Sequence, residues 1–95
     1  MKYFILILWL FLIVPLYAQT KVSGLVTDQD GLPISFANII FPGSIEGTIT
    51  NDDGSFYLES DKTYTLIEIS FIGFTTKKLS LKTAVNYQLK IVLEE

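Results

Sequence analysis

The sequence contains no cysteine and no histidine, and all seven of its basic residues are lysines. Without histidine and cysteine, the chain cannot form a Ser-His-Asp or Cys-His triad, a zinc site of the usual nitrogen and sulfur ligands, or a redox-active thiol pair. Disulfides, which stabilise many small exported domains, are excluded as well. Stability must therefore come from a packed apolar core, from a metal, or from contact with a larger partner.

Basic charge is also scarce, because ten acidic residues outnumber the seven lysines. Lys77 and Lys78 beside Lys82 are the nearest approach to a basic patch, and we interpret them as a solvated strand edge. No stripe of lysines is present that could neutralise a phosphate backbone. Nucleic acid is therefore not an expected partner.

A pair of carboxylates remains a formal possibility for catalysis. Glu46, Glu59 and Glu68 could formally supply an acid and base pair for a glycosidic bond. Their placement singles out no pair, and a small β-domain without a deep pocket is a poor host for one. We expect no enzyme activity and no cofactor.

Apolar residues form one long run, which is confined to the start of the chain. Lys2 precedes an apolar stretch from Tyr3 to Val14, followed by Pro15 and, three residues later, Ala18. As a helix, the segment to Ala18 would be about 24 Å long, shorter than the roughly 30 Å of a bilayer core. We predict a signal peptide over residues 1–18, cleaved after Ala18, with an uncleaved membrane anchor as the alternative.

Residues 19–95 are predicted to form one all-β domain. Short segments rich in Val, Ile, Phe, Tyr and Thr alternate with Gly, Pro, Asn and Asp clusters, and none has a sustained helical period. Strands are expected at 22–27, 36–41, 47–50, 55–58, 64–71, 75–81 and 87–93. The third and fourth are expected to form a hairpin around residues 51–54. In the last strand, alternation places Tyr87, Leu89, Ile91 and Leu93 on one face. A two-sheet sandwich is the expected architecture, and a small barrel is the alternative.

Several of these segments follow one family pattern in order. The pattern includes Gly24 to Asp28, Gly31 to Ile34, Ala37 to Ile39, Gly47 to Thr50, Asp53 to Leu58 and Ser70 to Phe74. In these residues the chain resembles the carboxypeptidase regulatory-like domain, across essentially all of residues 19–95. The residues that we assign to the pattern as structural are Gly24, Asp28, Gly31, Pro33, Ala37, Gly47, Thr48, Thr50, Gly54, Phe56, Leu58, Ser70 and Gly73.

The resemblance implies a seven-stranded, Greek-key-like β-sandwich of the transthyretin-like type. It also implies export in Bacteroidetes, where such domains form N-terminal extensions of TonB-dependent outer-membrane receptors, and it implies no catalysis. Asn51 stands where the family frequently has Asp, which removes one acidic ligand candidate.

Acidic residues cluster in two predicted turns, at Asp28 and Asp30 and at Asp52 and Asp53. Two such turns could converge at one end of a sandwich and offer oxygen ligands to calcium. The spacing does not match an EF-hand loop, whose twelfth position would be Ile39. We interpret these carboxylates as turn caps, with calcium as the weaker alternative.

Two classes of function remain. The first is an exported accessory module that binds an envelope or outer-membrane protein through its sheet surfaces or a free edge, in the periplasm or at the periplasmic face of the outer membrane. The second is a carbohydrate- or peptide-binding module in which Tyr57, Tyr64 or Tyr87 offers a ring face to the ligand. A truncated receptor fragment without an independent role is a further alternative.

Overall fold

The computed structural model describes residues 20–95, and the predicted signal peptide lies outside this range. The described chain folds into seven strands and contains no helix that is long and apolar enough to cross a membrane. The strands are β1 (Thr20–Thr27), β2 (Asn38–Ile40), β3 (Gly47–Ile49), β4 (Ser55–Ser60), β5 (Leu66–Ser70), β6 (Lys77–Ser80) and β7 (Val85–Val92).

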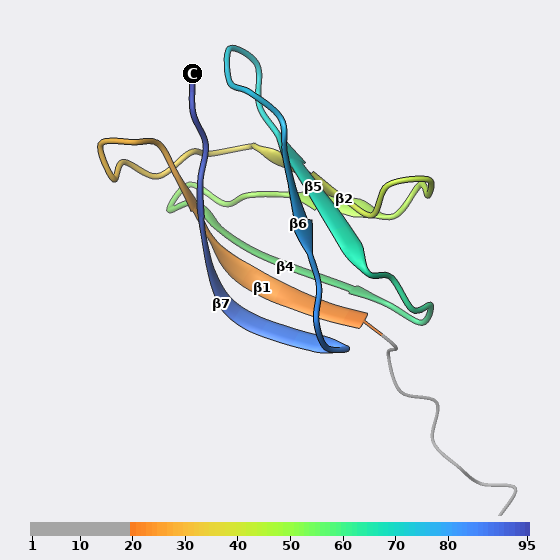
Figure 1. Ribbon diagram of the computed structural model, residues 1–95. Helices are drawn as coiled ribbons and strands as arrows, with labels where there is room; N and C mark the ends of the chain where they lie inside the picture. The colour runs from red at the N-terminus through yellow and green to blue at the C-terminus, as the bar shows by residue number, and fades with distance from the viewer. Residues whose placement is uncertain (1–19) are drawn as a thin grey trace, which may run out of the picture.

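Two sheets pack face to face (Figure 1). The first sheet has the order β4-β1-β7, and the second has the order β3-β2-β5-β6. Neighbouring strands are antiparallel except β1 and β7, which are parallel. The two-sheet sandwich predicted from the alternating pattern is confirmed.

The core lies between the sheets and is supplied by alternate residues of both. Val22 and Val26 of β1 point inward from the first sheet, while Ile67 and Ile69 of β5 point inward from the second, and all four are fully buried. Burying side chains of this size contributes about 1.5–3 kcal/mol each. The other buried apolar residues are Ile34, Ala37, Ile39, Phe41, Phe56, Leu58, Leu81, Ile91 and Leu93.

The predicted hairpin is wrong in its pairing, although the turn itself is present. β3 pairs with β2 and β4 pairs with β1, so the turn at residues 51–54 carries the chain from one sheet to the other. The local signal, Asn-Asp-Asp-Gly between two β segments, specifies a reversal of the chain and not the partner of each strand. The turn therefore closes one side of the sandwich.

The second strand is shorter than predicted because Phe36 is not part of it. Phe36 has a positive φ of 62° and is exposed, whereas Ala37 and Ile39 are fully buried as their alternation predicts. Its backbone N–H donates to the Thr50 carbonyl (3.0 Å), and the Ala37 N–H donates to Thr50 Oγ1 (2.9 Å). Thr50 Oγ1 in turn donates to the Ile34 carbonyl (2.5 Å). These bonds to one buried threonine hold the bend at Phe36. We call Ile34 to Ala37 together with Thr50 to Ser55 the turn corner.

Candidate functional site

The outer face of the first sheet carries the largest group of exposed apolar side chains in the described chain. Tyr57 and Tyr87 are 50% and 52% exposed, and Leu25, Val85 and Val92 are exposed between 39% and 48%. We call this surface, defined by those five residues, the tyrosine face. Because strand residues alternate between faces, Val22, Val26, Phe56 and Leu58 point to the core while their neighbours form this surface.

The strand register brings the two tyrosines to the same level of the sheet. Tyr57 of β4 is the partner of Ser23 of β1, and β7 lies on the other side of β1. Ser23 is therefore a small residue on the strand between two aromatic ones. The Tyr87 phenol lies near enough to Tyr57 to influence its ionisation.

A β-bulge explains why Tyr87 is on this face. The β1–β7 register shifts between Val22 and Gly24, and Gln88 opposite the shift has a positive φ of 59°. The extra residue reverses the alternation, so Tyr87 is exposed while Leu89 and Ile91 pack against the core. The prediction that Tyr87 shares a face with Leu89, Ile91 and Leu93 is therefore wrong.

Gly24 is needed where β7 comes closest to β1. A Cβ atom built at Gly24 would overlap the carbonyl oxygen of Leu89. Only glycine lets the backbones approach this closely, and the approach sets the position of the bulge. The signature glycine thus positions the tyrosine face without contributing a side chain to it.

The Tyr57 hydroxyl is protonated at physiological pH. Tyr57 Oη donates to Glu59 Oε2 (2.7 Å), and this bond is the main cause that raises the pKa of Tyr57 to about 12. The charge of Glu59 and the nearby Tyr87 add to the effect. The face thus presents two aromatic rings with one carboxylate at its border, a surface suited to apolar contact and hydrogen bonding.

A shallow depression of about 490 Å³ lies beside the tyrosines. Its floor is the middle of β1, and its sides come from β4 and from the bulged part of β7. The depression is lined by Ser23, Gly24, Leu25, Ser55, Phe56, Gln88, Leu89 and Lys90. It is wide and open, as expected for a contact surface and not for an enclosed catalytic pocket.

Tyr64, the third candidate tyrosine, lies outside the tyrosine face, and both its ring and its hydroxyl make contacts within the domain. Its ring stacks on Phe41 with centroids 4.3 Å apart, and its hydroxyl donates to Glu46 Oε2 (2.6 Å). Ser60 Oγ donates to the same oxygen (2.8 Å). These two hydrogen bonds are the main causes that lower the pKa of Glu46. The group ties the loop before β3 to the loop after β4.

The carboxylates of the two acidic turns accept hydrogen bonds from backbone N–H groups of their own turns. Asp28 Oδ1 accepts from the N–H groups of Asp30 (2.8 Å) and Leu32 (3.0 Å). Asp53 Oδ1 accepts from the N–H (3.0 Å) and the hydroxyl (2.5 Å) of Ser55, and these bonds lower the pKa of Asp53. Within residues 20–95, no three acidic side chains gather in a way that could hold a metal ion.

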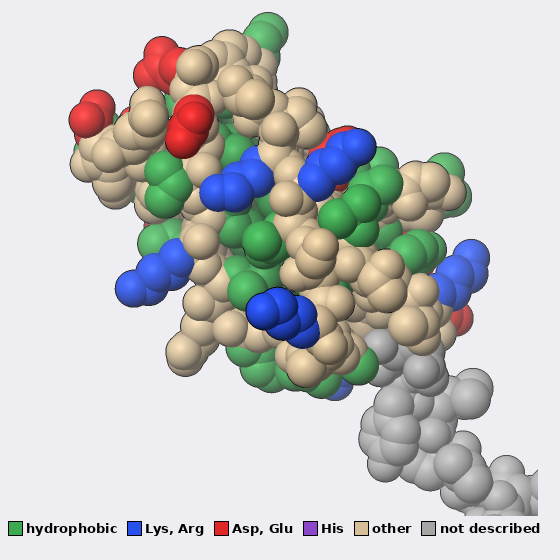
Figure 2. All heavy atoms as spheres, viewed as in Figure 1, with side chains coloured by type: hydrophobic (Ala, Val, Ile, Leu, Met, Phe, Trp, Pro, Cys, Tyr) green, Lys and Arg blue, Asp and Glu red, His purple; other side chains and the backbone are tan. Residues whose placement is uncertain are grey.

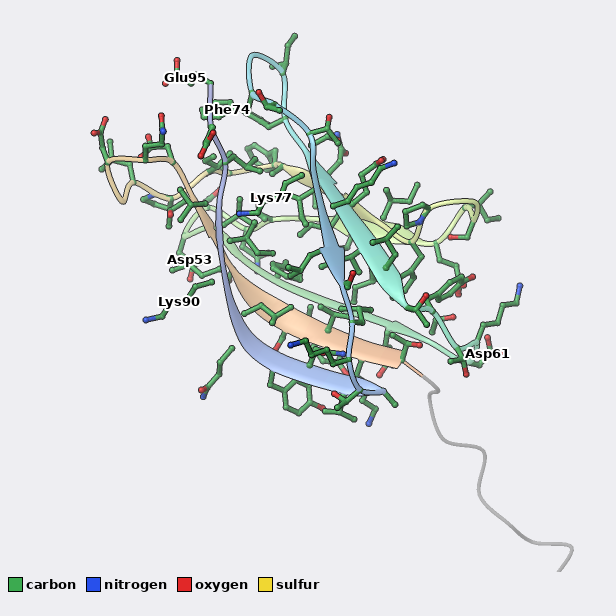
Figure 3. The ribbon with its side chains drawn as sticks, viewed as in Figure 1. Asp53, Asp61, Phe74, Lys77, Lys90 and Glu95 are labelled. Carbon is green, nitrogen blue, oxygen red and sulfur yellow. The ribbon has the colours of Figure 1, made fainter. Side chains whose placement is uncertain are left out.

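The three glutamates considered for catalysis are far from forming a pair. Glu46 belongs to the Tyr64 group, and Glu59 borders the tyrosine face. Glu68 lies in the second sheet, opposite Lys78 of β6. Two aspartates that flank β4, Asp53 and Asp61, are separated as well, because they lie at its opposite ends (Figure 3). Nothing in the described part of the chain indicates a reaction.

Sequence reasoning identified Tyr57 and Tyr87 but not the residues that complete their surface. Leu25, Val85 and Val92 are absent from the predicted site, as is the small Ser23 between the tyrosines. The alternation of Val22, Gly24 and Val26 was the available signal, since it places Ser23 and Leu25 on the outside of β1. The bulge at Gln88 left no comparable signal.

Comparisons with known proteins agree with this architecture. Residues 22–95 match the CarboxypepD_reg-like domain family. TonB-dependent receptor SusC of Bacteroides thetaiotaomicron is 40% identical over 86 residues, which cover 90% of this chain and 8% of that receptor. TonB-dependent receptor P39 of Formosa agariphila is 32% identical over 81 residues, covering 83% of this chain and 8% of the receptor. The chain thus spans less than a tenth of the length of these relatives.

Solved structures share the fold at low sequence identity. One is a chain in a type II cohesin–X-dockerin complex of Acetivibrio cellulolyticus, with a TM-score of 0.64, 15% identity, and coverage of 78% of this chain and 56% of that one. A second mutant of the same complex gives a TM-score of 0.63. With the family match over residues 22–95, the seven-stranded sandwich and the relatives among TonB-dependent receptors, the chain belongs to the CarboxypepD_reg-like domain family.

Proposed function

We propose that this domain is an exported, non-catalytic interaction module that binds an envelope protein through its tyrosine face. The observation that carries the proposal is that, of the ten large apolar side chains exposed in residues 20–95, five lie on one face of a three-stranded sheet. Single exposed apolar residues are common on soluble proteins, but several on the same face of one sheet support an interaction surface. Tyrosine is enriched in such surfaces because it combines a large apolar ring with a hydrogen-bonding hydroxyl.

The relatives support an envelope partner. They are TonB-dependent receptors, and the present domain corresponds to only 8% of each. The remaining parts of such a receptor, or a protein that assembles with it, are therefore the first partners to test. We place the module in the periplasm or at the periplasmic face of the outer membrane, with residues 1–18 as its export signal.

Site-specific photocrosslinking tests this proposal in the native host. A photoreactive phenylalanine analogue placed at Tyr87 should crosslink to an envelope protein, whereas the same group at Ile72 should not. Ile72 is the matched control because it is 90% exposed and lies outside the tyrosine face. Absence of a Tyr87 adduct, or the same adduct from both positions, would contradict the proposal.

A second candidate function is favoured by the tyrosine pair itself. Two exposed rings on either side of Ser23, bordered by Glu59 and Lys90, could stack on a sugar ring and bond to its hydroxyls. Titration of the full chain with a panel of soluble oligosaccharides separates the two functions. Tyr57 and Tyr87 amide shifts that saturate with a sugar favour this candidate, and their absence beside a protein crosslink favours the first.

A further inference from the structure

The two sides of the sandwich differ in how they are closed. On one side, the turn corner carries the chain from β3 to β4. On the other, β6 ends the second sheet and β7 ends the first, and no ladder joins them within the described chain (Figure 1). The hydrogen bonds between the two edges in the described chain lie at one end, where the Thr75 N–H donates to the Glu94 carbonyl (2.7 Å) and Lys77 Nζ to the Val92 carbonyl (3.3 Å). We call this open side, bordered by Lys77, Lys78 and Lys82, the lysine seam.

The free edge of β6 offers unpaired backbone groups to the seam. The Leu81 N–H donates to Thr65, so the backbone of Leu81 faces β5, and the register places Leu79 opposite Ile67. Because backbone groups alternate in direction along a strand, those of Lys78 and Ser80 face away from β5. Neither residue bonds to β7 in the described structure. An extended segment can therefore pair with them.

The seam also has an apolar floor. Leu79 of β6 and Leu89 of β7 are only partly buried and pack on the core from opposite edges. Figure 2 shows apolar side chains between β6 and β7 with lysine side chains around them. An added strand would bury this surface through every second side chain.

The charge of the lysine seam indicates what kind of added strand would bind there. Three of the six lysines in residues 20–95 border the seam, although the same residues include all ten carboxylates of the chain. Lys77 points from β6 toward β7, and Lys90 leans outward from β7 (Figure 3). The acidic groups nearby are Glu68, opposite Lys78, and Glu94 at the closed end. The seam is thus a basic strip on an acidic domain, complementary to an acidic segment.

We propose that the lysine seam binds an extended acidic segment of a partner protein, which adds as a strand to β6. Its backbone pairs with Lys78 and Ser80, its apolar side chains contact Leu79 and Leu89, and its carboxylates meet the seam lysines. This surface is distinct from the tyrosine face, so the proposal stands even if the tyrosine face binds nothing. The competing explanation is that the lysines only prevent sheets from associating edge to edge.

A peptide titration with matched charge variants tests the proposal. The probe is an eight-residue synthetic peptide that alternates valine with aspartate, added to the full chain and followed by amide chemical shifts. Saturable shifts are expected at Lys78, Leu79 and Ser80 of β6, and none with the counterpart peptide carrying lysine in place of aspartate. The Lys78→Glu/Lys82→Glu variant should lose at least tenfold in affinity, while Lys21→Glu/Lys62→Glu, with the same change in net charge, should lose less than threefold.

Four results would overturn the proposal. The first three are the absence of saturable binding, equal losses in the two double variants, and shifts confined to the tyrosine face. A fourth is dimerisation of Lys78→Gln/Lys82→Gln without peptide binding by the parent chain, which would show that the lysines serve only to guard the edge. Circular dichroism of each variant confirms that it is folded before its affinity is compared.

Discussion

The turn corner leads into β4 and the tyrosine face includes Tyr57 of the same strand, yet the two regions use opposite kinds of residue. The corner contains Thr50, Gly54 and Ala37, which are buried or conformationally restricted and belong to the family pattern. The face is made of exposed side chains outside the structural residues of that pattern, such as Tyr57 and Tyr87. Residues that identify the family therefore hold the sandwich together, and the proposed contact surface is supplied by others. Substitutions in the corner should change stability, and those on the face should change binding.

The largest effect on stability is expected for Gly54→Ala. Gly54 has a φ of 83°, and an added Cβ would lie 2.6 Å from the Val26 carbonyl oxygen and 3.0 Å from Pro33 Cβ. Left-handed strain and the clash together should cost about 3 kcal/mol in the free energy of unfolding, measured by urea denaturation. Gly31→Ala is the control, because its φ is 82° but its Cβ would meet nothing within 4 Å. The control should lose only about 1 kcal/mol, and equal losses would remove the clash from the explanation.

Thr50→Val is expected to come next. The side chains have nearly the same shape, but valine cannot bond to the Ile34 carbonyl or to the Ala37 N–H, and Thr50 is 1% exposed. Leaving these groups unsatisfied should cost about 2 kcal/mol in the free energy of unfolding. Thr76→Val, at an exposed position, should change it by less than about 0.5 kcal/mol. A neutral Thr50→Val would show that this threonine does not hold the bend at Phe36.

Glu46→Gln should produce a smaller effect that depends on pH. Hydrogen bonds from Tyr64 and Ser60 lower the pKa of Glu46 below its ordinary value of 4.5 in the folded state. Between the two pKa values the unfolded chain binds more protons, so stability rises with pH through this window. The contribution is fully present above the unfolded pKa and is lost as the pH falls through the folded one.

Urea midpoints at pH 7 and pH 3 measure this contribution. The parent chain should be more stable than Glu46→Gln at pH 7, and the difference should shrink at pH 3. Glu68→Gln controls for the loss of one negative charge. A difference between the parent chain and Glu46→Gln that is the same at both pH values would contradict the role assigned to the carboxylate.

The parts of the fold that alternation determines could be predicted, and the parts set by pairing could not. The burial of Ala37 and Ile39, and of Ile67 and Ile69, follows from the period of two along each strand. The sandwich itself was predictable for the same reason. Phe36 was not, because its left-handed backbone depends on hydrogen bonds that the Phe36 and Ala37 N–H groups donate to Thr50, a residue distant in sequence. The local backbone preference of Phe36 cannot predict a hydrogen bond to a residue so far along the chain.

The candidate site shows the same division. Tyr57 could be placed on the outer face of β4 because Phe56 and Leu58 on either side are clearly core residues. Tyr87 could not be placed by alternation, since the bulge at Gln88 shifts the register by one residue. A bulge depends on how two strands pair and not on either strand alone. The surface that Tyr57 and Tyr87 form together could therefore be recognised only from the structure.

If the tyrosine face binds an envelope protein, as proposed, a pair of variants that removes its rings should lose that binding. Tyr57→Ser/Tyr87→Ser removes the two rings, whereas Ile45→Ser/Ile72→Ser removes two other apolar side chains that are 102% and 90% exposed. Each pair lies on the surface, so each substitution should change the free energy of unfolding by less than about 0.5 kcal/mol.

The measurement is the amount of envelope protein that copurifies with each full-length variant after mild crosslinking in the host. The recovered envelope protein should fall at least tenfold for the tyrosine pair and should not fall for the isoleucine pair. Equal recovery with all three proteins, or a loss only with the isoleucine pair, would contradict it.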